Sequence, residues 1–262
     1  MYFERLWHSF AGLPEVTAIA LGGSRVTGSY DEKSDYDLYI YCDTVPDDSV
    51  RRQILETNCS YIEQGNAFWE LEDDCTLKDG VDIDILYRSI SEIADGLTYV
   101  VEGCHPSNAY TTCIWHNILT CRVLYDREGA LGKLIERFSV PYPEKLRQNI
   151  IKRGMRLLHG NLPSYDAQIQ KAAKRGDLIS VNHRTAAFLE TCFDVIFALN
   201  RMTHPGEKRM LQTAVDKAEI LPEDFEKNIN ILLRSVFTDL QTAEEALNSI
   251  VTGLERIIKD HC

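Results

Sequence analysis

The stretch from residue 16 to residue 38 constrains the fold more than any other part of this sequence. It opens with an apolar run that ends in Gly22-Gly23-Ser24-Arg25, and it closes with Asp35-Tyr36-Asp37-Leu38. Small residues after a strand leave backbone N–H groups available to bind phosphate oxygens. In an extended strand alternate side chains share a face, so Asp35 and Asp37 point the same way. The stretch predicts a phosphate-binding turn followed by two carboxylate ligands for Mg²⁺.

A second acidic strand is predicted over residues 80–88. Asp82 and Asp84 alternate there with apolar residues, which is typical of a strand with one face in a core and the other in a cleft. Both aspartates fall on the same face, so either can supply a third carboxylate. Two other acidic runs, Asp47-Asp48 and Glu70-Glu72-Asp73-Asp74, are best explained as solvated surface.

The arrangement of the remaining elements predicts an α/β domain followed by a helical one. Apolar periodicity indicates strands at 16–21 and 36–42, with less distinct strands at 61–62 and 68–71. Pro141 and Pro143 interrupt the chain, so we expect domains at 1–140 and 141–262. Helices are predicted at 2–12, 47–58, 89–102, 107–120 and 127–138, then at 143–159, 164–176, 178–202, 206–218, 222–235 and 239–260. The helix that starts near Asp177 is apolar around most of its circumference and should lie at the centre of a bundle.

Charge and composition exclude several classes of protein. The net charge is −12, which argues against a partner held by a general positive field, such as nucleic acid. Residues 1–100 contain 7 Lys and Arg against 20 Asp and Glu, whereas the remainder contains 21 against 20. The chain has no apolar run long enough to span a membrane and no signal-peptide pattern, so we expect a cytoplasmic protein.

The cysteines and the competing phosphate motifs are also informative. Eight cysteines occur without a CxxC pair, so they are expected to be reduced thiols, and zinc is not expected. Gly23 and Gly28 have the spacing of a P-loop, but the lysine that such a loop requires is missing. A Walker-type NTPase is therefore disfavoured.

The combined motifs resemble the nucleotidyltransferases of the DNA polymerase β superfamily. The resemblance rests on Gly-Gly-Ser-Arg at 22–25, on Asp35 and Asp37, and on the later strand with Asp84. Small bacterial members of two domains, which modify antibiotics such as kanamycin and lincosamides, are the more similar ones. The signature covers about residues 16–88, while the helical half is similar only in general character.

The resemblance implies a mixed-sheet nucleotidyltransferase domain with an all-helical bundle, and it assigns roles to the residues. Asp35, Asp37 and Asp84 would be catalytic and would hold two Mg²⁺ ions, with Asp82 as the alternative third ligand. Asp84 is preferred because Ile-Leu-Tyr-Arg after it is similar to the third strand of the family. The phosphates of ATP or another NTP would be bound by the residues of the turn, Gly22, Gly23, Ser24 and Arg25.

The predicted reaction is transfer of a nucleoside monophosphate, AMP from ATP, to a hydroxyl of a small molecule such as an antibiotic, with release of pyrophosphate. Alternatives are AMP transfer to a protein and an antitoxin-like or regulatory nucleotide-binding protein with little turnover; a homodimer is compatible with each. A basic stretch at Lys145, Arg147, Lys152, Arg153 and Arg156 is best explained as a solvated helix face. Arg153 and Lys208 are also candidates to contact the triphosphate or an anionic acceptor.

Overall fold

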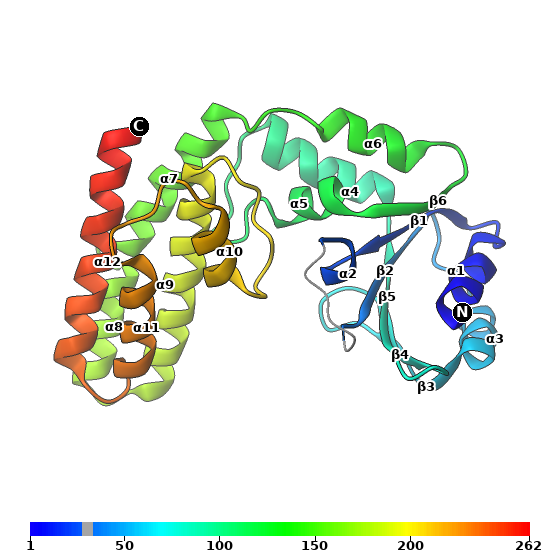
Figure 1. Ribbon diagram of the computed structural model, residues 1–262, viewed down its shortest axis with the longest axis horizontal. Helices are drawn as coiled ribbons and strands as arrows, with labels where there is room; N and C mark the ends of the chain where they lie inside the picture. Colours follow the sequence, from blue (N-terminus) through cyan, green and yellow to red (C-terminus); the bar gives the residue numbers. More distant parts are fainter. Residues whose placement is uncertain (28–33) are drawn as a thin grey trace. The chain divides into compact units, whose positions relative to one another are not determined.

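The computed structural model describes residues 1–27 and 34–262. These residues form two compact units (Figure 1). Unit 1 comprises Met1–Thr98 and Asn117–Val140, and unit 2 comprises Tyr99–His116 and Pro141–Cys262. We retain domains 1–140 and 141–262 as a proposal, and note that residues 99–116 pack with the helical unit.

Within the described residues, unit 1 is built on a six-stranded sheet in the order β3-β4-β5-β2-β1-β6. Strands β2 and β5 run parallel and the other neighbouring strands run antiparallel, which confirms the predicted mixed sheet. The strands are β1 (Val16–Gly22), β2 (Tyr36–Cys42), β3 (Cys59–Asn66), β4 (Glu72–Leu77), β5 (Asp82–Arg88) and β6 (Arg122–Asp126).

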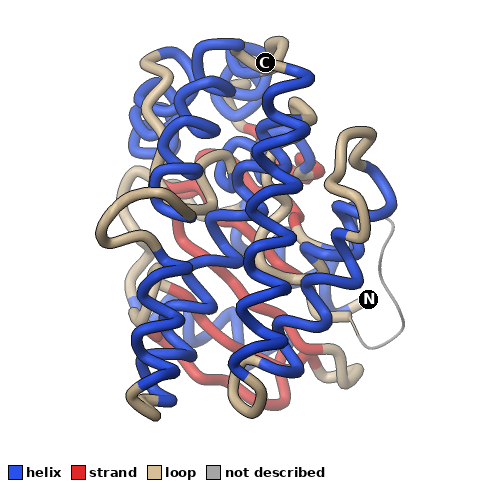
Figure 2. Tube along the Cα trace, turned by 90° about the vertical axis from the view of Figure 1, so that its left-hand side faces the viewer, coloured by secondary structure: helices blue, strands red, loops and turns tan. Residues whose placement is uncertain are grey.

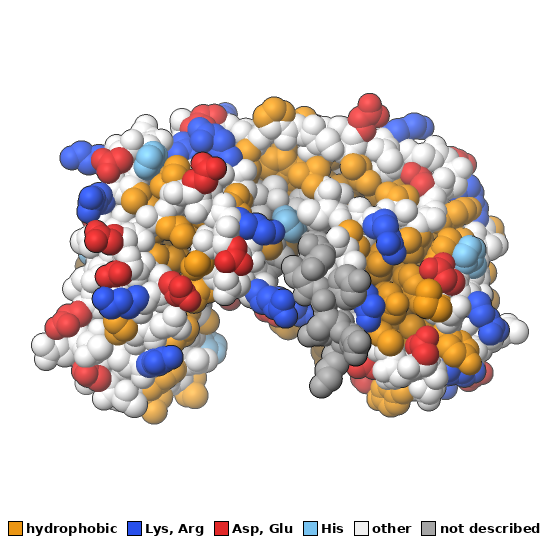
Figure 3. All heavy atoms as spheres, viewed as in Figure 1, with side chains coloured by type: hydrophobic (Ala, Val, Ile, Leu, Met, Phe, Trp, Pro, Cys, Tyr) orange, Lys and Arg blue, Asp and Glu red, His pale blue; other side chains and the backbone are white. Residues whose placement is uncertain are grey.

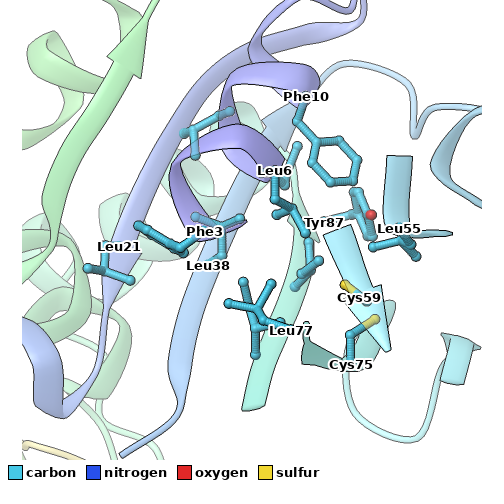
Figure 4. Packing of buried hydrophobic residues seen from close by; sticks show 14 of the residues in the cluster. Phe3, Leu6, Phe10, Leu21, Leu38, Leu55, Cys59, Cys75, Leu77 and Tyr87 are labelled. Atoms are coloured by element: carbon cyan, nitrogen blue, oxygen red, sulfur yellow. The ribbon is translucent and has the colours of Figure 1, made fainter. Parts of the chain in front are cut away.

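Helices α1 (Tyr2–Ala11) and α3 (Asp48–Asn58) pack on the sheet on the side of its main hydrophobic core. The spacing of three and four along α1 places Phe3, Leu6 and Phe10 on one buried stripe. Figure 4 shows these side chains pointing toward residues from neighbouring strands, among them Leu38 and Leu77. Because side chains alternate along a strand, the residues between the core residues face the other side of the sheet.

The other helices of the first half are shorter. They are α2 (Ser24–Thr27), α4 (Ile90–Leu97), the π-helical turn η1 (Thr98–Glu102), α5 (Cys113–Thr120) and α6 (Ala130–Phe138). Helix α6 contacts β1 and β6. Helix α2 ends at Thr27, after which the described part of the chain resumes at Ser34.

The prediction for the β3–β4 region was correct only in part, since the predicted strand at 61–62 lies within β3. Residues 68–71, predicted as a strand, form no strand, and the strand begins only at Glu72. The error came from reading the acidic run as solvated surface, whereas residues 72–77 alternate between the two faces of β4. Asp73, Cys75 and Leu77 are buried in this alternation, and the residues between them are partly exposed.

Asp73 belongs to a buried ion pair. The Arg51 guanidinium of α3 donates from Nη1 to both carboxylate oxygens of Asp73, at 2.5 and 2.6 Å. Tyr87 donates its hydroxyl to Asp73 Oδ2 at 2.7 Å, and the Gly65 N–H donates to Oδ1 at 2.9 Å. Side-chain exposure is 2% for Arg51 and 0% for Asp73, so the interpretation of this acidic run as solvated surface was wrong for Asp73.

Unit 2 is helical, as predicted, and Figure 2 shows its long helices running alongside one another. Helix α9 contacts α7, α8 and α10, which confirms its predicted central place in the bundle. A Cβ on Gly154 of α7 would lie 2.3 Å from Val195 Cγ2 of α9, so glycine permits the close approach of these two helices. The helices are α7 (Glu144–Leu158), α8 (Tyr165–Lys174), α9 (Leu178–Leu199), α10 (Met210–Lys217), α11 (Phe225–Ser235) and α12 (Leu240–His261).

One member of the predicted basic helix face lies inside the bundle. Arg147 of α7 is 2% exposed, and its Nη2 donates to the carbonyl oxygen of His261 at 3.2 Å. Its Nε donates to the Leu199 carbonyl at 3.3 Å, and Nη1 pairs with Glu144 at 2.8 Å. Because both carbonyls lie at helix C-termini, the cation offsets the negative ends of α9 and α12. The prediction of a solvated role was wrong for Arg147.

The helices, the cysteines and the charged side chains of the described chain bear on the remaining general predictions. None of its helices is long and apolar enough to cross a membrane. All eight cysteines lie in the described residues, and none is joined in a disulfide. Acidic and basic side chains are interspersed over unit 2 on the face shown in Figure 3.

A buried carboxylate in α9 predicts a pH-dependent stability of unit 2. Asp194 accepts hydrogen bonds from the Thr111 N–H at 3.1 Å and from the Thr111 hydroxyl at 2.6 Å. Burial raises the pKa of Asp194 to about 6, although these two hydrogen bonds oppose the rise. The folded protein therefore binds this proton more tightly than the unfolded chain, and the resulting stabilisation is lost as the pH rises from about 4 through 6.

We expect Asp194→Asn, which keeps an acceptor and a donor for Thr111, to remove this pH dependence. The free energy of unfolding of the variant should rise relative to the wild type by about 1–3 kcal/mol between pH 4 and pH 7. Urea unfolding at several pH values measures the difference, in which the other titrating groups cancel. A difference that does not change with pH would contradict the assignment.

Candidate functional site

The turn after β1 is shaped by two glycines that touch side chains of β2. Gly22 pairs with Asp37 in the antiparallel register of β1 and β2. A Cβ on Gly22 would lie 2.3 Å from Cε2 of Tyr39, and a Cβ on Gly23 would lie 1.7 Å from Oδ2 of Asp37. Gly23 also has a φ of 66°, which disfavours other residues. The turn thus places the backbone of Gly23 against the Asp37 carboxylate, and Ser24 follows as the first residue of α2.

Two of the three predicted carboxylates lie on adjacent strands. Asp37 of β2 pairs with Asp84 of β5 in the parallel register, and Asp35 comes just before β2. Burial, followed by the negative charges of Asp35, Asp37, Asp74 and Glu72, raises the pKa of Asp84 to about 6. The structure therefore brings Asp35, Asp37 and Asp84 close enough to interact electrostatically.

Asp82 has a different environment from Asp84. It is exposed, and its Oδ1 accepts a hydrogen bond from the hydroxyl of Thr76 at 2.8 Å. Its partner in the register of β4 and β5 is Thr76, whereas Asp84 lies between Asp37 and Asp74. The geometry favours Asp84 as the third carboxylate of this site.

Asp74 and Glu72 extend the row of carboxylates onto β4, and neither was predicted. Asp74 pairs with Asp84 across the antiparallel register, and Asn66 Nδ2 donates to Asp74 Oδ2 at 2.5 Å. Burial and the charges of Asp74 and Glu70 raise the pKa of Glu72. The alternation of residues 72–77 was the signal that could have placed both side chains on this face.

A polar network supports the turn from behind. Asn117 of α5 donates from Nδ2 to the hydroxyl of Tyr39 at 2.8 Å, and its Oδ1 accepts from Arg88 Nη1 at 3.1 Å. The Arg88 guanidinium lies over the Tyr39 ring, 4.0 Å from its centroid, and binds both Glu70 oxygens at 2.7 and 2.9 Å. These contacts fix the ring against which Gly22 packs.

The remaining predicted residues lie in other surroundings. Arg25 donates from Nε to the carbonyl oxygens of Ser34 and Asp35 at 2.8 and 3.0 Å. Arg153 of α7 donates to the side chain of Asn108 within unit 2. Lys208 is an exposed residue of the loop before α10. Contacts of Arg153 and Lys208 with a triphosphate stay predictions.

The donor set of the carboxylate row suits a hard divalent cation. Within residues 1–27 and 34–262, no group of three or more His, Cys, Asp or Glu side chains is already arranged to hold a metal ion. The carboxylates of Asp37 and Asp84 nevertheless lie side by side in register, and their mutual repulsion favours a cation between them. Carboxylate oxygens are also the ligands that Mg²⁺ prefers, so the residues fit this ion.

Comparison with known families separates the chain into two parts. Residues 4–102 match the model described as "Nucleotidyltransferase domain". Residues 4–102 are a nucleotidyltransferase domain. Residues 110–210 match a model described as "Domain of unknown function (DUF4037)". The nucleotidyltransferase domain contains the turn and all of the acidic residues of the site, as the resemblance to the polymerase β superfamily implied.

Solved structures with distant similarity carry related descriptions. A nucleotidyltransferase-like protein from Exiguobacterium sibiricum has 12% identity and a TM-score of 0.44, over 99% of this chain and 74% of its own. An aminoglycoside 6-adenyltransferase from Bacillus subtilis has 9% identity and a TM-score of 0.31, over 98% and 90%. A spectinomycin adenyltransferase from Enterococcus faecialis, solved with ATP and spectinomycin, has 11% identity and a TM-score of 0.33, over 97% and 98%. These TM-scores are too low to identify an acceptor, and the comparison with curated proteins gave no match.

Proposed function

We propose that this chain transfers a nucleoside monophosphate, AMP from ATP, to a hydroxyl of a small-molecule acceptor and releases pyrophosphate. The observation that carries the proposal is the register of Asp37 with Asp84 on adjacent parallel strands, beside the turn in which Gly23 abuts Asp37. The match of residues 4–102 to a nucleotidyltransferase domain supports the proposal, in which the turn would bind phosphates and the row of carboxylates would bind metal ions.

Asp35, Asp37 and Asp84 would hold two Mg²⁺ ions, and the N–H groups of Gly22, Gly23 and Ser24 would face the phosphates. When bound, the ions supply charge neutralisation for the non-bridging oxygens of the triphosphate. The pairing of β2 with β5 holds Asp37 and Asp84 at fixed positions relative to each other. Gly22 and Gly23 allow the backbone of the turn to lie close to β2, because a side chain at either position would collide with residues of that strand.

In the proposed reaction the acceptor hydroxyl oxygen forms a bond to the α-phosphorus. The bond between the α-phosphorus and the oxygen that leads to the β-phosphate breaks, and pyrophosphate leaves. Asp84 would take the hydroxyl proton on a carboxylate oxygen. In the metal-free protein, burial and the neighbouring carboxylates raise the pKa of Asp84 to about 6, and bound cations would oppose this rise.

The acidity of the site suggests the charge of the acceptor. The carboxylates of Glu72, Asp74 and Asp84 line one face of β4 and β5, and residues 1–100 carry a large excess of acidic side chains. Such a surface attracts cations and repels anions. We therefore propose a cationic acceptor with a hydroxyl group, such as an aminoglycoside antibiotic.

The experiment that tests this proposal is a survey of pyrophosphate release. Each of the four NTPs is incubated with Mg²⁺ and the protein against aminoglycosides, lincosamides and candidate protein acceptors, with Asp37→Ala as the control. Release with one acceptor that Asp37→Ala abolishes supports the proposal. Release that survives this variant contradicts the metal assignment, and release only with a protein acceptor indicates the protein-modifying alternative. ATP binding without release against every acceptor would favour the antitoxin-like or regulatory alternative.

A further inference from the structure

Arg25 of α2 holds the backbone that leads into β2. Its Nε donates to the carbonyl oxygens of Ser34 and Asp35 at 2.8 and 3.0 Å, and its Nη2 also donates to the Ser34 carbonyl. The second carbonyl belongs to one of the proposed metal ligands. Arg25 itself follows Ser24 directly, so one side chain joins the phosphate turn to the residues that carry the carboxylates.

Aromatic stacking fixes the plane of this guanidinium. The Arg25 Cζ lies 4.0 Å from the centroid of the Tyr36 ring. Phe3 of α1 stacks on the Tyr36 ring, with 4.1 Å between the centroids and 9° between the planes. Because Phe3 is 3% exposed and belongs to the hydrophobic core, the stack connects Arg25 to a rigid part of unit 1.

We propose that Arg25 is a positioning residue that fixes the carboxylates of Asp35 and Asp37 for metal binding by holding the Ser34 and Asp35 carbonyls against the turn. This inference rests on the proposed function, because it concerns the same metal ligands. It gives Arg25 a role different from that of the phosphate ligand suggested by its place after Gly-Gly-Ser. Asp35 lies outside the ladder of β2, so its peptide gains from a side-chain support that Asp37 obtains from the sheet.

The geometry also explains why an arginine is suited to this position. A planar guanidinium can donate to two carbonyl oxygens from one edge while its face stacks on a ring. A lysine ammonium carries the same charge, but it lacks the planar set of N–H donors and the flat surface that stacks on a ring. Arg25→Lys should therefore behave like a loss of the side chain, which a pure charge contact with phosphate does not predict.

Binding of Mn²⁺ alone, without nucleotide, tests the inference through the decrease of the electron paramagnetic resonance signal of the free ion. We expect Arg25→Met and Arg25→Lys to weaken Mn²⁺ binding about tenfold, as loss of a group that orients metal ligands commonly does. In EDTA, the affinity of Arg25→Met for ATP should stay within about twofold of the wild type, because the proposed role involves no phosphate contact. Tyr36→Leu, which removes the stacking ring, should weaken Mn²⁺ binding about threefold.

Arg127 offers a matched control. Its guanidinium donates to the carbonyls of Leu13 and Pro14 at 2.7 and 2.9 Å and lies 6.0 Å from the Tyr125 centroid. These contacts resemble those of Arg25 but are made before the start of β1, at the end of the strand opposite to Gly23. Arg127→Met should lower the thermal stability as Arg25→Met does and leave Mn²⁺ affinity within about twofold of the wild type.

Two results would overturn the inference. One is wild-type Mn²⁺ affinity in folded Arg25→Met, and the other is a loss of metal-free ATP binding as large as the loss of Mn²⁺ binding. If Arg25→Met does not fold, Tyr36→Leu decides, and unchanged Mn²⁺ affinity in that variant counts against the inference. Failure of the proposed function gives a different result, because Asp37→Asn would then leave the Mn²⁺ affinity of the otherwise native protein unchanged.

Discussion

Replacing Asp84 by asparagine is expected to reduce pyrophosphate release about a thousandfold or more, because it removes a metal ligand and the proton acceptor together. The loss of several kcal/mol of transition-state stabilisation corresponds to a rate reduction of about this size. The measurement is the initial rate of pyrophosphate release with the best acceptor under saturating Mg²⁺-ATP. Asn has nearly the shape of Asp, so the sheet should keep its register.

Asp82→Asn is the matched control for this variant. Asp82 lies two residues away on the same strand and on the same side, but it is exposed and bonded to Thr76. Its replacement should change the rate by no more than about threefold, since the lost charge is exposed to solvent and screened by salt. A larger loss in Asp82→Asn than in Asp84→Asn would reverse the assignment of the third carboxylate.

The strands of the site could be predicted because their patterns are local. The apolar run of β1 ends at two glycines, and the alternation of β5 is visible over seven residues. The spacing of Asp35 and Asp37 likewise needs only the period of a strand. These three signals located the turn and both acidic strands with small errors at the ends.

The register between the strands could not be predicted. Asp37 and Asp84 are separated by α3 and two further strands, so nothing in the sequence shows that they pair directly. The choice between Asp82 and Asp84 depended on this register and came instead from the family resemblance. The same limit applies to Arg25, whose contacts with Ser34 and Asp35 join residues that a pattern of local periodicity cannot place together.

Strand β4 was missed because charge was given more weight than alternation. A buried Asp73 is unexpected from its charge alone, since isolated charges are rarely buried. Its partner Arg51 lies on the preceding helix, and the pairing brings the side chain of α3 onto β4. An acidic residue at an inward position of a strand therefore indicates a buried partner of opposite charge. The contribution of this ion pair to the stability of unit 1 can be tested directly.

Asp73→Ala is expected to destabilise unit 1 by about 3–5 kcal/mol, which is the usual cost of leaving a buried charge without its partner. The Arg51 guanidinium would stay in the core, and Tyr87 and Gly65 would each lose a hydrogen-bond acceptor. Urea unfolding should be followed in a Trp115→Phe background, in which the remaining tryptophans, Trp7 and Trp69, both belong to unit 1.

A second pair of variants separates the cost of the unpaired charge from the net contribution of the ion pair. Replacing Arg51 and Asp73 together by Met and Leu removes both charges, so it should cost less than Asp73→Ala despite the larger change. Asp79→Ala, at an exposed position of the turn between β4 and β5, should change stability by less than about 0.5 kcal/mol. If Asp73→Ala costs no more than Asp79→Ala, the pair does not stabilise the fold. If the double variant costs as much as Asp73→Ala, the loss of the hydrogen bonds to Asp73 explains the destabilisation, and the unpaired charge of Arg51 does not.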